Sequence, residues 1–266
     1  TFGRLNPQRD PASDRLTWQL DAEEVKRLQA VASREFPALS PHMSLFIAFA
    51  ALLVSLMSRI SQRRSIGFEA PFANRATRRD QQTPGLFIEL FPLAADVDEA
   101  TTFADLGHQI QKQLPATVKY GMPGSSVPTG NNGCDAVLNF IPFLLGDFDG
   151  RAVQAQFVHP GAHDAAHALR LQVWDLCSDG GLTIMFDINR AMVGVQNQGT
   201  VINYFKSLLA SFIDQPDAQV AAIPLLSATQ RSRVIDDYND TGSAALPTRP
   251  VTWSSRMGSA WRLTMS

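Results

Sequence analysis

The chain has 266 residues, of which 45% are hydrophobic, and a formal net charge of −2. This length is enough to bury a sizeable core in one large domain or two small ones. The small net charge gives no electrostatic reason to expect nucleic acid or an anionic membrane as a partner, so we predict neither. Because Cys134 and Cys177 form no disulfide framework and no secretory pattern opens the sequence, we expect a cytoplasmic protein.

Two helices are predicted in the first quarter of the chain. In "DAEEVKRLQAVASREF", Asp21 is a suitable cap and Glu24 follows three residues later, which is a capping-box pattern. In "MSLFIAFAALLVSLM" (43–57) nearly every residue is apolar, with Ser40 as a cap and Pro41 in the first turn. This run is shorter than the roughly 20 apolar residues that a membrane-spanning helix needs. We therefore predict a helix buried in a protein core.

Strands and helices are mixed along the rest of the chain. Residues 66–73 and 86–97 are strand-like and flank a polar, Arg-rich bend. An amphipathic helix begins at Phe103, and Pro115 should disturb or end it. "CDAVLNFIPFLL" predicts a strand, "LRLQVWDLCSDGGLTIMFDIN" a hairpin about "SDGG", and "VINYFKSLLASFI" a helix. This pattern predicts an α/β fold in which a mixed β-sheet packs with helices.

Few segments carry chemistry of their own. The sequence has no G-x-S-x-G, no Walker loop and no G-x-G-x-x-G, and "GMPGSSVPTG" (121–130) is better explained as a flexible loop. Both cysteines lie in strand-like settings, where buried thiols are inert. Three histidines and an aspartate occur together in "HPGAHDAAH": His159, His163, Asp164 and His167. Pro160 and Gly161 argue against the helix that would gather them around a metal, so we predict a solvated loop and no metal.

Several segments in this order resemble the C-terminal half of a condensation domain from nonribosomal peptide synthetases. "LTWQLDAEEVKRLQAVASRE" resembles its opening helix and "SLFIAFAALLVSLMSRIS" its buried helix. "IGFEAPFANR", "GLFIELFPLAADVD" and "AVLNFIPF" resemble family segments written V-G-x-P-x-A-x-R, G-x-F-V-N-T-L-x-L-R and F-Q-V-x-F-N. "SDGGLTIMFDIN" resembles the hairpin strand that follows, and "PLLSATQRSRVIDDYNDT" resembles the exit toward an adenylation domain.

The resemblance implies one chloramphenicol-acetyltransferase-like half, which faces a second half across a tunnel. In this family, carrier proteins bring acyl and aminoacyl thioesters into the tunnel on phosphopantetheine arms, and an amide bond forms. The second His of an H-H-x-x-x-D-G motif, in the N-terminal half, assists the attack of the amine. That role suits a His with a near-neutral pKa. This chain lacks the motif. The resemblance therefore implies no catalytic residue here, no directly bound cofactor, and an absent N-terminal catalytic half.

The resemblance also suggests two tunnel-lining residues. Asn139 in "VLNF" matches the strand Asn that faces the tunnel in the family, although plain strand structure explains it equally well. Glu89 places a carboxylate where the family has the Asn of N-T. Asn74 and Arg75 match the polar turn at the end of the "ANR" strand, and we expect them to be structural. "KYGMPGSSV" replaces the family's H-Q-D-x-P-F-E.

From these segments we divide the chain into three parts. Residues 1–226 are expected to form the half-domain, 227–242 a condensation-to-adenylation linker, and 243–266 an irregular tail. The tail is either disordered or the end of a truncated or frame-shifted product. The expected partners are carrier proteins, the N-terminal half and the adenylation domain of the same synthetase. Without that half, strands such as "AVLNFIPFLL" would expose an apolar face and promote self-association.

Two other functions remain open at this point. One is a non-catalytic module that docks carrier proteins, and the other is a stand-alone acyltransferase of the same fold. The acyltransferase would need a general base, and the sequence shows no candidate. An epimerisation domain would share the fold, but the "DDYNDT" exit argues against it.

Overall fold

The computed structural model describes residues 10–37, 40–73, 75, 77–120, 134–142, 146–151, 153, 155–163, 166–174 and 180–237. The chain divides into two compact units, Thr1–Leu225 and Leu226–Ser266. Several features predicted from the sequence lie outside the described residues: Asn74, Asp164, Cys177, the loop 121–130 and the tail 243–266.

A six-stranded mixed sheet organises the first unit, in the order β1-β6-β5-β4-β2-β3. The strands are β1 (Ser13–Leu20), β2 (Ser65–Phe72), β3 (Glu89–Asp96), β4 (Ala136–Ile141), β5 (Leu169–Trp174) and β6 (Leu182–Asn189). β4 runs parallel to both of its neighbours, β5 and β2, and the other neighbouring pairs are antiparallel. The predicted α/β class with a mixed sheet is therefore confirmed.

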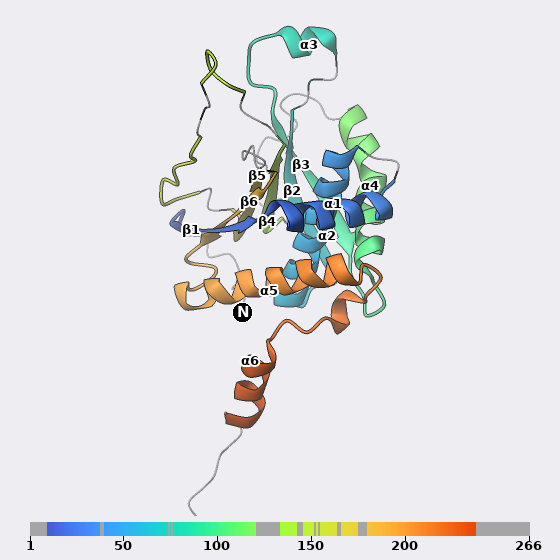
Figure 1. The fold of residues 1–266 in the computed structure, drawn as a ribbon, viewed down its shortest axis with the longest axis vertical. Helices are drawn as coiled ribbons and strands as arrows, with labels where there is room; N and C mark the ends of the chain where they lie inside the picture. Colours follow the sequence, from blue (N-terminus) through green and yellow to red (C-terminus); the bar gives the residue numbers. More distant parts are fainter. Residues whose placement is uncertain are drawn as a thin grey trace, which may run out of the picture. The chain divides into compact units, whose positions relative to one another are not determined.

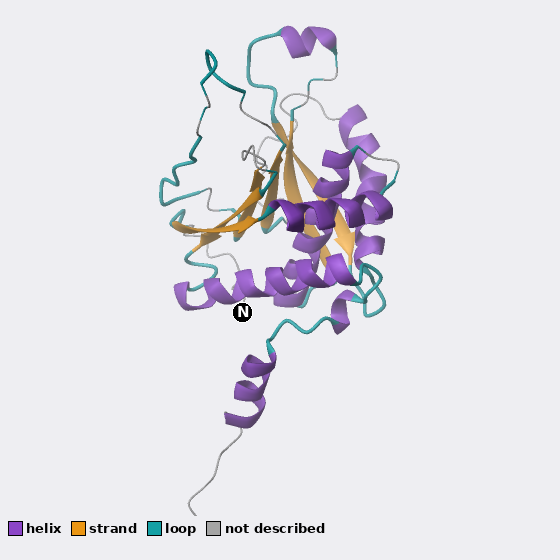
Figure 2. Ribbon diagram, in the orientation of Figure 1, coloured by secondary structure: helices purple, strands orange, loops and turns teal. Residues whose placement is uncertain are grey.

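Helices pack on one face of this sheet (Figure 1 and Figure 2). They are α1 (Ala22–Glu35), α2 (Pro41–Ser61), α4 (Phe103–Tyr120) and α5 (Val195–Asp214). Aromatic contacts join the two layers: Phe49 of α2 lies 6.1 Å from Phe140 of β4, and Phe205 of α5 lies 5.3 Å from Phe186 of β6, between ring centroids. The hydrophobic core therefore lies between the helices and this face of the sheet.

The apolar helix predicted from 43–57 is the centre of the core. Within the described residues, α2 is the single helix long and apolar enough to cross a membrane, and 83% of its most apolar window is buried in the fold. Ser40 caps it with a hydrogen bond from the Met43 N–H. The burial confirms the prediction of a core helix.

The predicted helices form, but several of their boundaries differ; α5, for example, begins at Val195 rather than at Val201. Asp21 and Glu24 form the expected capping box of α1. The residues just before it, however, belong to β1 rather than to the opening helix, because the side chains of Leu16, Trp18 and Leu20 alternate toward the core. Pro115 does not end α4, which continues to Tyr120. A proline removes one helical hydrogen bond, and the buried apolar side of α4 still packs on the core.

The described part of the Arg-rich bend between β2 and β3 is organised around Arg75, and the strand after it begins at Glu89 rather than at 86. It contains a short helix, α3 (Arg78–Gln82). The Arg75 guanidinium donates to the carbonyl oxygens of Asp80, Thr83 and Gly85 and lies 4.2 Å from the centroid of the Phe87 ring. Arg75 is therefore structural, as predicted from its match to the turn.

Within the second unit, the described residues form two short turns of helix. α6 (Ala228–Ser232) is followed by a π-helical turn, η2 (Arg233–Asp237). The Ser227 hydroxyl accepts a hydrogen bond from the Gln230 N–H, and the Gln230 side chain accepts one from the Ser227 N–H. This capping box defines the start of α6.

A close helix contact at Gly107 gives a stability prediction. A Cβ at Gly107 of α4 would overlap the buried ring of Phe36. We expect Gly107→Ala to lower the free energy of unfolding by about 1–3 kcal/mol, because the packed ring must move. Gly199, exposed in α5 with nothing within 4 Å of its Cβ position, is the matched control. Gly199→Ala should raise stability by up to about 1 kcal/mol in urea unfolding. Equal stability of the Gly107 variant and the wild type would contradict the contact.

Candidate functional site on the polar face of the sheet

The sheet face that points away from α2 carries polar and charged side chains. Because side chains alternate along a strand, residues next to the core-facing ones belong to this second face. Its central positions form one row across five strands, since Glu69 pairs with Val137, Val137 with Arg170, Arg170 with Asp187, and Asp187 with Arg15. We call this the polar face and define it by Arg15, Glu69, Asn139, Arg170, Gln172 and Asp187.

The expectation of an exposed apolar face agrees only in part with the structure, because this face carries polar and apolar side chains together. β4 presents Val137, Asn139 and Ile141 to it, and the neighbouring positions of β5 and β6 are Gln172 and Asp187. Much of the face is already covered: the exposed fractions are 7% for Gln172 and 2% for Asp187. Self-association of the chain through this face stays a prediction.

Residues 155–163 cover part of the polar face. The Arg15 Nη1 donates to the carbonyl oxygen of Phe157 at 3.1 Å, and the Phe157 ring lies against Trp174. The backbone N–H groups of Ser13 and His163 donate to the carbonyls of Gly161 and Pro11, so this segment pairs with the start of β1. On the β3 side, Pro92 and Ala94 remain exposed. The polar face is thus closed over β1 and β6 and open toward β3.

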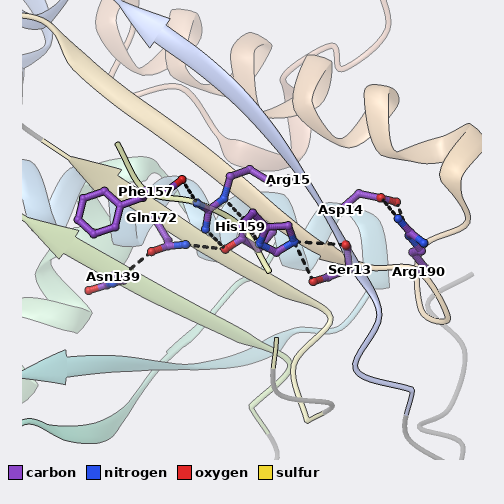
Figure 3. Close-up of polar contacts among 9 residues, drawn as sticks. Ser13, Asp14, Arg15, Asn139, Phe157, His159, Gln172 and Arg190 are labelled. Atoms are coloured by element: carbon purple, nitrogen blue, oxygen red, sulfur yellow. Dashed lines mark hydrogen bonds and ion pairs between the residues drawn. The ribbon is translucent and has the colours of Figure 1, made fainter. Parts of the chain in front are cut away.

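A buried ion pair stands at the centre of the polar face (Figure 3). Arg15 donates to both carboxylate oxygens of Asp187, at 2.6 and 2.8 Å. Gln172 Nε2 donates to Asp187 Oδ2 at 2.5 Å, and Asn139 Nδ2 donates to Gln172 Oε1 at 3.4 Å. The side chains of Arg15 and Asp187 are 15% and 2% exposed, so water has little access to the pair. The two hydrogen bonds to one carboxylate make the contact bidentate.

The described histidines of the cluster are buried or largely buried, which corrects the predicted solvated loop. His159 Nε2 lies 3.2 Å from both the hydroxyl and the carbonyl oxygen of Ser13, and its Nδ1 lies 3.7 Å from Asp187. His163 and His167 are 9% and 6% exposed. The loop prediction failed because the backbone of residues 161–163 pairs with the start of β1, and that pairing carries His159 and His163 onto the sheet.

The described part of the cluster contains no group of three or more His, Cys, Asp or Glu that could hold a metal. His167 instead contacts a carboxylate, with 3.2 Å between its Nε2 and Glu69 Oε2. Pro160 and Gly161 do prevent a helix here, as predicted, and Gly161 has a positive φ of 78°.

Cys134 lies near Glu69 of the polar face. Burial raises the pKa of the Cys134 thiol to about 11, and the carboxylates of Glu69 and Asp135 act in the same direction. The thiol is therefore almost wholly protonated at neutral pH and is a poor nucleophile, as expected from its strand-like setting.

The structure does not bring the two sequence-predicted site residues together. Asn139 lies in the middle of β4 on the polar face, whereas Glu89 pairs with Phe72 at the start of β3. Phe72 packs against Phe46 of α2, so strand alternation puts Glu89 on the helix-covered side. The two residues therefore lie on opposite faces of the sheet, and a tunnel-lining role for either of them stays a prediction.

Sequence reasoning missed Arg15, Gln172 and Asp187. The signal was present in the strands themselves, since "LRLQVW" and "LTIMFDIN" both place polar residues among apolar ones at alternating positions. A polar residue inside a buried strand needs a partner, and such partners lie close together across a sheet. Which strands pair, and in which register, was needed to identify them.

Comparison with known proteins assigns the family. Residues 4–235 match the model of the Condensation domain family. This chain belongs to that family. The similar curated proteins include two linear gramicidin synthase subunits of Brevibacillus parabrevis. One is 22% identical over 76% of this chain, and the other is 23% identical over 86% of it. The chain spans 3% and 4% of their respective lengths.

Solved structures show the same fold. The first condensation domain of the CDA synthetase superposes with a TM-score of 0.64 at 18% identity, over 81% of this chain and 48% of that one. Holo-AB3403, a four-domain nonribosomal peptide synthetase, superposes with a TM-score of 0.67 at 15% identity, over 83% of this chain and 18% of that one. The chain thus spans about half of the CDA condensation-domain structure.

Proposed function

We propose that residues 1–226 form the C-terminal half of a nonribosomal peptide synthetase condensation domain. The observation that carries this proposal is the match to 48% of the CDA condensation-domain structure by a chain that lacks H-H-x-x-x-D-G. The open β3 side of the polar face, where Pro92 and Ala94 are exposed, supports it as well, because a second half could cover this side.

In this function the chain provides one wall of the reaction tunnel. Carrier proteins deliver acyl and aminoacyl thioesters on phosphopantetheine arms, and the amine of one attacks the thioester carbonyl of the other to form an amide and release a thiol. The His that accepts the amine proton comes from the N-terminal half, outside this sequence. Asn139 lines the tunnel, and the work of this chain is to position the arms. We place the reaction in the cytoplasm.

Residues 227–242 serve as the linker toward an adenylation domain in this proposal. The capping box at Ser227 supports an ordered start of this segment, and its sequence supports the family exit. The N-terminal half and the adenylation domain would then belong to the same synthetase.

A hybrid domain tests the proposed function. The N-terminal half of a condensation domain from linear gramicidin synthase is joined to this chain and supplied with acyl- and aminoacyl-loaded carrier proteins. We expect amide product from the hybrid and none from the 266-residue chain alone, measured by mass spectrometry of the carrier-bound product. The control hybrid carries Ala in place of the second His of the motif and should be inactive. Amide formation by the isolated chain, abolished by a substitution within it, would refute the proposal that the catalytic His belongs to the N-terminal half.

A further inference from the structure

The buried Arg15–Asp187 ion pair determines which way the Asn139 amide is turned. Gln172 lies between Asp187 and Asn139 and transmits this orientation. An ionised carboxylate only accepts hydrogen bonds, so Asp187 requires the NH₂ end of Gln172 to face it. The oxygen of Gln172 then faces Asn139, which must turn its own NH₂ end toward Gln172. Asn139 Oδ1 is left pointing away from Gln172 (Figure 3). Within the described residues it accepts no hydrogen bond.

A second unsatisfied group lies on the same face of the neighbouring strand. Trp174 is 5% exposed, and within the described part of the chain its Nε1–H has no hydrogen-bond partner. It follows Gln172 by two positions and pairs with Ile141, which follows Asn139 by two positions. Buried donors without partners are rare and cost about 1–3 kcal/mol each. A ligand that reaches this donor would supply the missing partner.

We propose that Asn139 Oδ1 and Trp174 Nε1 form an acceptor–donor pair that binds a secondary amide. A secondary amide carries one N–H donor and one C=O acceptor, which complement the two groups. Gln172, Asp187 and Arg15 are positioning residues, because they keep the oxygen of Asn139 turned toward the ligand. The inference rests on the proposed function, in which the amide belongs to a carrier-bound arm in the tunnel.

The positioning role is tested on the 266-residue chain without any ligand. In ¹H–¹⁵N spectra, the hydrogen-bonded proton of the Asn139 NH₂ group should resonate well downfield of its partner. Gln172→Met removes the acceptor and leaves both Arg15–Asp187 hydrogen bonds in place, so the two proton shifts should converge. Met185→Leu, a swap of an apolar neighbour paired with Gln172, is the matched control and should leave the separation unchanged. An unchanged separation in Gln172→Met would overturn the positioning role.

The ligand is tested with N-acetylcysteamine, which contains a single secondary amide. Titration should move the indole N–H resonance of Trp174. Asn139→Ala and Gln172→Met should each weaken binding by about fivefold to tenfold, the loss expected for one hydrogen bond. The N-methylated amide lacks the donor, so the wild type should bind it more weakly, whereas Asn139→Ala should not distinguish the two compounds.

Two results would overturn the amide site: an indole resonance that does not move, or equal binding of both compounds to the wild type. Neither measurement depends on catalysis. An inactive hybrid domain with the expected titration would refute the proposed function and leave the amide site standing. An active hybrid with no response at Trp174 would refute the amide site alone.

Discussion

Phe49→Asp is expected to abolish cooperative folding of the first unit. Phe49 is fully buried in α2, where its ring stacks on Phe205 at 6.5 Å and 7° and lies against Phe140 of the sheet. Loss of a core phenylalanine alone costs about 3–5 kcal/mol. A carboxylate without a partner costs several kcal/mol more, and a domain has only about 5–15 kcal/mol in total.

The measurement for Phe49→Asp is thermal unfolding followed by circular dichroism. Leu86→Asp is the matched control, because Leu86 is 89% exposed and its substitution should leave the melting temperature nearly unchanged. A soluble Phe49→Asp protein that melts at the wild-type temperature would mean that α2 is not the core helix described above.

Asp187→Ala is expected to lower the free energy of unfolding by about 3–5 kcal/mol, because Arg15 would keep its charge in a site with little water. The control is Asp214→Ala, which breaks the exposed Arg27–Asp214 pair, whose side chains are 62% and 63% exposed. Surface pairs of this kind contribute less than about 1 kcal/mol. Urea unfolding of both variants compares the same chemistry in two environments.

A double variant separates the charge from the packing. Replacing both partners, in Arg15→Met with Asp187→Leu, should recover most of the stability lost in Asp187→Ala, since no buried charge is left alone. Two results would contradict this account: an equal loss of unfolding free energy in Asp187→Ala and Asp214→Ala, or a double variant as unstable as Asp187→Ala. Either would mean that the buried ion pair does not stabilise this part of the polar face.

The helices were the most predictable part of the fold. Asp21 with Glu24, and Ser40 with Pro41, are local signals whose physical effect extends over one turn, so they can be recognised without tertiary information. The antiparallel pairing of β5 and β6 could also be predicted, since the two strands are consecutive and close together in the sequence. α4 continues past Pro115, although proline disfavours a helix interior, because its buried apolar side chains pack on the core.

The candidate site was much less predictable, since its parts are far apart in sequence. Arg15 and Asp187 are 172 residues apart, and Asn139 is linked to Gln172 only through the parallel pairing of β4 and β5. The burial of His163 likewise depends on a segment that pairs with β1, and His167 is buried beside Glu69 of β2. Neither composition nor spacing carries that information, because strand order and register decide which side chains meet.

The most direct test of the half-domain proposal is association with the other half. The 266-residue chain is mixed with a separately produced N-terminal half of a linear gramicidin synthase condensation domain. Complex mass is followed by light scattering and backbone protection by hydrogen exchange. We expect a one-to-one complex in which β3 and β4 gain protection, because the open side of the polar face becomes covered. Two components that stay separate at every concentration, or protection confined to α1, α4 and α5, would contradict a tunnel wall on the polar face.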